Sequence, residues 1–185
     1  MKGKYGGVLL IATAQDGDSH SYPLAFGIVD SLNDASWDQF FIKLKFVVSN
    51  NPRLVMISDK QSSIQKAISN VYPMAHRGIC TYHLKKNVIT KSGGSKIAKL
   101  VQTTSKAYTS NEFDGIFGEI RRENYKLGVY LVEANVRLWS RAYFSGDKYD
   151  TTKSNSAESL NNVLKKPREL PILSLLEVIR NTHTQ

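Results

Sequence analysis

The stretch that decides the fold is LVMISDKQSSIQKAISNVYPMAHRGICTYHLKK, residues 54–86. Its first five residues, 54–58, are mostly apolar and run directly into Asp59, which predicts a buried strand ending in a carboxylate. A helical pattern follows at once, because apolar residues recur at the spacing of one helix face: Ile64, Ala67, Ile68 and Val71. A carboxylate between a buried strand and a helix lies at the rim of an α/β sheet, where ligands and metals usually bind. Asp59 is therefore the first candidate site residue.

Composition narrows the class of protein. The chain has 185 residues, of which 41% are hydrophobic and 22% charged, as expected for one globular domain with an insertion. Its net charge of +9 favours a polyanionic partner, most commonly nucleic acid, although a soluble protein with scattered lysines is the alternative. The single cysteine excludes an internal disulfide and fits a reducing compartment. No membrane-spanning run or signal peptide is present in the sequence, so we expect no membrane partner and a cytosolic or nuclear location.

Two strands are predicted ahead of the central stretch. Residues 8–15 and 22–29 are apolar runs separated by Asp16-Gly17-Asp18, a hairpin turn signal, so they should pair antiparallel. An amphipathic helix follows and should end at residues 50–52; its apolar face is marked by Trp37, Phe40, Phe41, Leu44 and Val48. With strands at 54–58 and 76–80 and a helix opening near Thr81, the order predicts an α/β fold: a mixed sheet with flanking helices.

The second half of the chain is predicted to be helical. After the Ser-Gly-Gly-Ser joint at residues 92–95, three helical runs are predicted, and their apolar positions are Ile97, Leu100, Val101 and Ala107; Phe113, Ile116, Phe117 and Ile120; and Leu131, Ala134, Leu138 and Trp139. We expect an all-helical insertion at 92–148, between residues 1–91 and residues 149–185 of the core. In the last part a helix capped by Asn155 precedes a closing helix, 172–182, which Pro171 opens.

Cys80 and His83 form a C-x-x-H spacing where the strand at 76–80 meets the next helix. A structural zinc site is tetrahedral, so this pair is half of one. The remaining histidines, His20, His76 and His183, provide no second ligand pair at useful spacing. A structural or DNA-proximal role for Cys80 and His83 is therefore favoured over a complete zinc site.

Five segments together resemble the catalytic domain of Mutator-like (MULE) plant transposases. They are KGKYGGVLLIATAQDGD (2–18), YPLAFGIVDSLNDASWDQFF (22–41), LVMISDKQSSIQKAI (54–68), AHRGICTYHLKKN (75–87) and TTKSNSAESLNNVLKKPRELPILSLLEVIR (151–180). The resemblance implies a ribonuclease-H-like fold interrupted by the helical insertion. It also implies a DDE set of three carboxylates that holds two Mg²⁺ or Mn²⁺ ions for DNA cleavage and strand transfer. A nuclear location, transposon ends and target DNA as partners, and a homo-oligomer are implied as well.

The family's second carboxylate matches Asp59 and its third matches Glu158, while its C-x-x-H matches Cys80 and His83. Its first carboxylate belongs to an Asp-Gly-Thr segment that precedes the part matching Lys2-Gly3-Lys4. We therefore expect the first strand and its aspartate to be missing. Asp59 and Glu158 alone could hold one ion weakly. We expect that this chain does not nick DNA by itself. The alternative to a transposase catalytic-core fragment is a domesticated, non-catalytic module that binds DNA or protein.

Each carboxylate also has a local interpretation. Asp59 could cap the helix that follows it, because Asp is a favoured N-cap residue. Glu158 stands three residues after Asn155, the offset of a capping box. Glu119, Glu123 and Glu133 are rival third carboxylates, but they lie in the predicted insertion, where they should face solvent.

Overall fold

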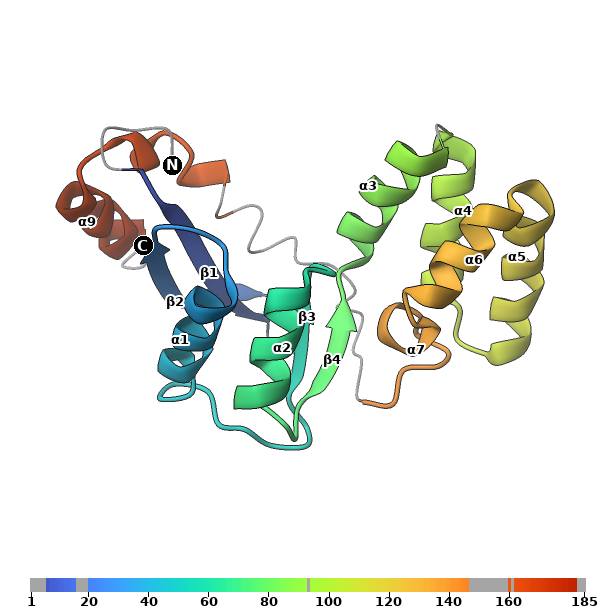
Figure 1. The fold of residues 1–185 in the computed structure, drawn as a ribbon, viewed down its shortest axis with the longest axis horizontal. Coiled ribbons are helices and arrows are strands. Elements are labelled where there is room, and N and C mark those ends of the chain that lie inside the picture. Colours follow the sequence, from blue (N-terminus) through green and yellow to red (C-terminus); the bar gives the residue numbers. More distant parts are fainter. Residues whose placement is uncertain (1–5, 16–19, 93, 147–159, 161, 183–185) are drawn as a thin grey trace. The chain divides into compact units, whose positions relative to one another are not determined.

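The computed structural model describes residues 6–15, 20–92, 94–146, 160 and 162–182, and these form two compact units. One unit combines Met1–Ser49 with Asn155–Gln185, and the other is Asn50–Ser154. Figure 1 shows the elements of each. The predicted turn at Asp16-Gly17-Asp18, the capping residue Asn155 and the candidate Glu158 lie outside the described residues.

The first unit is built on an antiparallel hairpin. Strands β1 (Val8–Gln15) and β2 (Ser21–Val29) pair in register from Val8 opposite Val29 to Gln15 opposite Ser21, as the sequence predicted. The register shifts once, because Ala12 pairs with Ala25 while Thr13 pairs with Pro23. Proline cannot donate a ladder hydrogen bond and is tolerated in strands at such irregularities.

Helix α1 (Asp34–Leu44) packs on one face of this hairpin. Asn33 caps it, accepting a hydrogen bond from the backbone N–H of Ser36 at 2.8 Å. The ring of Phe40 lies so close to Gly27 of β2 that a Cβ there would stand 2.8 Å from Cδ2 of the ring. Glycine at position 27 therefore sets how closely the helix approaches the sheet.

The C-terminal helices pack on the other face. Helical residues at 160, 162 and 163, the 3₁₀ turn η1 (Pro167–Glu169) and α9 (Ile172–Thr182) make up the described C-terminal part. A core joins Leu9 of β1 to Leu164, Leu175 and Ile179. Because the hairpin is covered on both faces, its strands read as nearly continuous apolar runs.

Helix α1 is shorter than predicted, because it ends at Leu44 and not near Asn50. The backbone N–H of Phe46 donates to the carbonyl of Lys43 and that of Val47 to the carbonyl of Leu44, which tightens the chain into a turn. Phe46 in this turn is 84% exposed, and Val48, the last apolar position of the predicted helix, is half-buried but lies beyond the helix end.

The second unit begins with a parallel strand pair. Strands β3 (Val55–Ser58) and β4 (His76–Ile79) align from Val55 opposite His76 to Ser58 opposite Ile79, and α2 (Ser62–Val71) connects them. The helix buries the apolar face that the sequence indicated. Helix α3 (Thr81–Ser92) follows β4 directly, where it was expected.

The rest of this unit is helical wherever it is described. Helices α4 (Ser95–Lys106), α5 (Ser110–Glu123), α6 (Tyr125–Glu133) and α7 (Val136–Trp139) share one core with α3. Trp139 is completely buried in it and donates from Nε1 to the carbonyl of Leu131 at 3.1 Å. The prediction that Trp139 lies on the apolar face of this part of the chain is confirmed.

The prediction of a single third helical run was wrong, because the structure has two helices there, α6 and α7. Asn135 separates α6 from α7 with a φ of 61°, a conformation that asparagine tolerates better than most residues. Its side chain accepts from the backbone N–H of Arg137 at 3.2 Å and so caps α7.

The α/β class is thus confirmed as a mixture of small sheets and several helices. Among the described residues, the strands form two two-stranded sheets, one antiparallel and one parallel. The boundaries at residues 91/92 and 148/149 stay a prediction. In the described part of the chain, helices are too short or too polar to cross a membrane.

Candidate functional site

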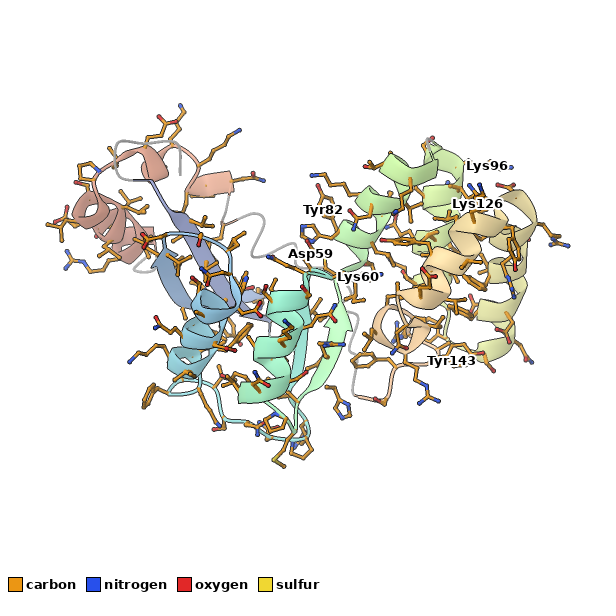
Figure 2. The ribbon with its side chains drawn as sticks, in the orientation of Figure 1. Asp59, Lys60, Tyr82, Lys96, Lys126 and Tyr143 are labelled. Atoms are coloured by element: carbon orange, nitrogen blue, oxygen red, sulfur yellow. The ribbon has the colours of Figure 1, made fainter. Side chains whose placement is uncertain are left out.

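The candidate site lies at the carboxyl edge of the parallel strand pair. Because β3 and β4 run in the same direction, their last residues, Ser58 and Ile79, lie side by side. The backbone N–H of Cys80 donates to the carbonyl of Ser58 at 2.8 Å and continues the ladder one step. Asp59 and Cys80 therefore leave the sheet at the same edge, where Figure 2 also places Lys60 and Tyr82.

The Asp59 carboxylate is half-buried and held by its own backbone. Oδ1 accepts a hydrogen bond from the backbone N–H of Lys60 at 2.6 Å. Helix α2 begins only at Ser62, its N-cap is Gln61, and no side chain caps it. The alternative of Asp59 as a helix cap was therefore wrong, and the carboxylate is available for another role.

The loop after Asp59 is fixed by a second contact. The side-chain amide of Gln65, in the first turns of α2, donates from Nε2 to the carbonyl of Lys60 at 3.2 Å. Both backbone polar groups of Lys60 are thus engaged, which holds the strand-to-helix connection in one conformation.

Two lysines meet at one aromatic ring in the same unit. Nζ of Lys60 lies 4.8 Å from the ring centroid of Tyr130, and Nζ of Lys91 lies 4.8 Å from the same centroid. Lys91 belongs to the last turn of α3 and Tyr130 to α6. Sequence reasoning missed this cluster, and the one available signal was the position of Lys60 directly after Asp59.

The two residues of the C-x-x-H pair differ in burial. The Cys80 side chain is completely buried, whereas His83 is half-buried in the first turn of α3. The His83 ring stands edge-to-face on Tyr82, with the ring centroids 5.6 Å apart. Within the described ranges, no three His, Cys, Asp or Glu side chains gather in a group able to hold a metal. A structural or DNA-proximal role for Cys80 and His83 stays a prediction, as does zinc.

The rival carboxylates behave as solvent-facing residues. Glu119, Glu123 and Glu133 are all exposed on the helices that follow α3. Glu123 pairs with Lys96 at 2.8 Å, on a part of the unit that Figure 2 shows well away from Asp59. Because Glu158 lies outside the described residues, its proximity to Asp59 stays a prediction.

Basic and aromatic side chains also meet elsewhere in this unit. The guanidinium of Arg141 stacks 3.9 Å from the ring centroid of Tyr108, which is 71% exposed. Arg121 lies 5.9 Å from the ring of Tyr125. On β4 itself, burial lowers the pKa of Arg77 from its ordinary value. Basic groups next to exposed rings are suited to phosphates and bases.

Comparison with known proteins finds a family match over the first 87 of the 185 residues. Residues 1–87 match the family model of the MULE transposase domain, and this region contains Asp59, Cys80 and His83 but not Glu158. The transposase for insertion sequence element IS905 of Lactococcus lactis subsp. lactis (strain IL1403) is 26% identical over 120 residues. That match covers 65% of this chain and 27% of the relative, so the chain spans little more than a quarter of the relative's length. The resemblance to MULE transposases is thus confirmed over residues 1–87.

Proposed function

We propose that this chain is part of the catalytic core of a Mutator-like transposase with a ribonuclease-H-like fold, whose full-length form cleaves DNA and transfers strands. One observation carries the proposal. Within the region that matches the MULE transposase domain, Asp59 follows directly after β3, and its half-buried carboxylate does not cap α2. An acidic group held at the carboxyl edge of a parallel strand pair is suited to a ligand.

The Asp59 site fits the chemistry of a hard divalent cation. Mg²⁺ and Mn²⁺ prefer carboxylate oxygens, and the Lys60 N–H holds Oδ1 of Asp59 in a fixed orientation. We assign Asp59 as one metal ligand and, on the resemblance, Glu158 as another. Metal held by these carboxylates would supply positive charge to stabilise the attacking and leaving oxygens of a phosphoryl displacement.

DNA is the proposed partner. The net charge of +9 and the basic groups beside exposed aromatic rings, such as Arg141 beside Tyr108, support an interaction with a polyanion. Because such binding releases counterions, it should weaken steeply with salt and depend little on sequence. A nuclear location and a homo-oligomeric assembly belong to the same proposal.

The test uses a protein in which this chain is joined, at its N-terminus, to a segment that supplies the family's Asp-Gly-Thr. The purified product is incubated with a DNA duplex and Mg²⁺ or Mn²⁺. We expect nicking that Asp59→Asn abolishes and that Glu119→Gln, which removes an exposed carboxylate, leaves unchanged. Salt-sensitive DNA binding without nicking would favour the alternative, a non-catalytic transposase-derived binding module. Nicking unaffected by Asp59→Asn would overturn the assignment of Asp59.

A further inference from the structure

The Lys60–Tyr130–Lys91 cluster brings two positive charges together from distant parts of the sequence. Both ammonium groups lie 4.8 Å from one ring centroid, so the two Nζ atoms can be no further apart than twice that distance. Cations are attracted to an aromatic face, but two like charges at this separation also repel each other. Among the described residues, neither lysine forms an ion pair with a carboxylate. The arrangement is thus suited to an anion.

The cluster is built on well-held parts of the fold. Tyr130 is half-buried and packs against the helical core, and α3, which carries Lys91, buries Leu84 and Val88 in the same core. The backbone of Lys60 is fixed by its N–H bond to Asp59 and by the contact from Gln65. The backbone segments that carry the two lysines, and the ring next to both ammonium groups, are therefore held in place before any ligand arrives.

Its place in the fold suggests which anion it takes. Lys60 follows Asp59 directly, so the positive cluster adjoins the candidate metal ligand. A lysine ammonium binds phosphate as a compact point charge with three donors. A nucleic-acid backbone offers successive phosphates on a strand that could pass from this cluster to the Asp59 carboxylate.

We propose that Lys60 and Lys91, braced by the Tyr130 ring, form a phosphate-binding pair that holds the nucleic-acid backbone next to Asp59. The inference rests on the proposed function, since it takes DNA as the ligand. Lys60 and Lys91 act here as positioning residues: they bind backbone phosphate and take no part in a proton transfer. Because phosphate contacts carry no sequence information, the pair should contribute affinity and not base specificity.

The experiment measures binding of the full chain to a fluorescently labelled DNA duplex by anisotropy, across a series of salt concentrations. Each of Lys60→Gln and Lys91→Gln removes one phosphate contact. Each should therefore reduce affinity about five-fold at 0.15 M salt and lower the slope of log K against log salt by about 0.9. Lys60→Arg and Lys91→Arg keep the charge and should keep both values close to those of the wild type.

Lys106→Gln is the matched control, because Lys106 is an exposed lysine in the last turn of α4 and its loss changes the net charge by the same amount. It should leave the slope unchanged. If Lys60→Gln and Lys91→Gln weaken binding no more than Lys106→Gln does, the assignment of Lys60 and Lys91 to phosphate binding is wrong, while the proposed function stands. If the wild-type chain shows no salt-dependent binding, the proposed function is wrong and the phosphate pair with it.

Discussion

The backbone N–H of Lys60 donates to the Asp59 carboxylate at 2.6 Å, and α2 begins three residues beyond Asp59 without using that carboxylate as a cap. The acidic group is thus oriented by the strand-to-helix connection and is not needed to start the helix. Asp59 can therefore serve a ligand site without contributing much to the stability of the fold.

Asp59→Asn should leave the fold almost unchanged. The amide oxygen can still accept from the Lys60 N–H, and no helix cap is lost. We expect the free energy of unfolding, measured by denaturant titration, to change by less than about 1 kcal/mol. A loss above about 2 kcal/mol would show that the carboxylate is a structural group and would contradict its assignment to a ligand site.

Gly27→Ala should destabilise the first unit. The added Cβ would stand 2.8 Å from Cδ2 of Phe40, so α1 or the ring must move, at a cost of about 1–3 kcal/mol. Unfolding of Gly27→Ala, Phe40→Leu and the double variant measures the coupling. We expect Gly27→Ala to cost less once the ring is gone, and equal costs in both backgrounds would contradict the contact.

Asn135 should be replaceable by glycine far better than by alanine. Alanine loses the cap on the Arg137 N–H and must adopt a φ of 61°, for a combined cost of roughly 2 kcal/mol. Glycine loses the cap but adopts that φ without strain, so it should cost a few tenths of a kcal/mol. Thermal unfolding of the two variants gives the comparison, and the reverse order would show that the backbone at 135 is not constrained as described.

Trp139→Phe should weaken the core of the second unit. The change removes the hydrogen bond from Nε1 to the Leu131 carbonyl and leaves a cavity where the completely buried indole was packed. We expect a loss of about 2–3 kcal/mol in the unfolding free energy. Tyr108→Phe is the control, because that ring is largely exposed, and it should be close to neutral. Equal effects of the two changes would argue against the packing around Trp139.

Local patterns were enough to predict most elements. The hairpin strands, the strand and helix on either side of Asp59, and the helix from Ile172 to Thr182 all lie within a residue or two of their expected bounds. Two helix boundaries were missed, because apolar spacing continues across Asn135 and past Leu44 although the chain turns at both places. At Asn135 a positive φ and a side-chain cap separate two helices, and after Leu44 the backbone hydrogen bonds tighten into a turn.

The site could be predicted only in part. Asp59 is recognisable because strand, carboxylate and helix are consecutive in the sequence, and the structure places it where that order indicated. The meeting of Lys60, Lys91 and Tyr130 depends on the packing of α3 and α6, which no local spacing encodes. The partnership of Asp59 with Glu158 stays a prediction.

The most direct measurement of that partnership is Mn²⁺ binding by isothermal titration calorimetry. It compares the wild-type chain with Asp59→Asn, Glu158→Gln, the double variant and Glu133→Gln, an exposed glutamate in α6 that serves as the control. If the two carboxylates hold one ion, each single change should weaken binding by at least the ten-fold typical of losing an outer-shell partner. The double variant should then bind little worse than either single one. Mn²⁺ binding that Glu158→Gln affects no more than Glu133→Gln would contradict the shared metal site.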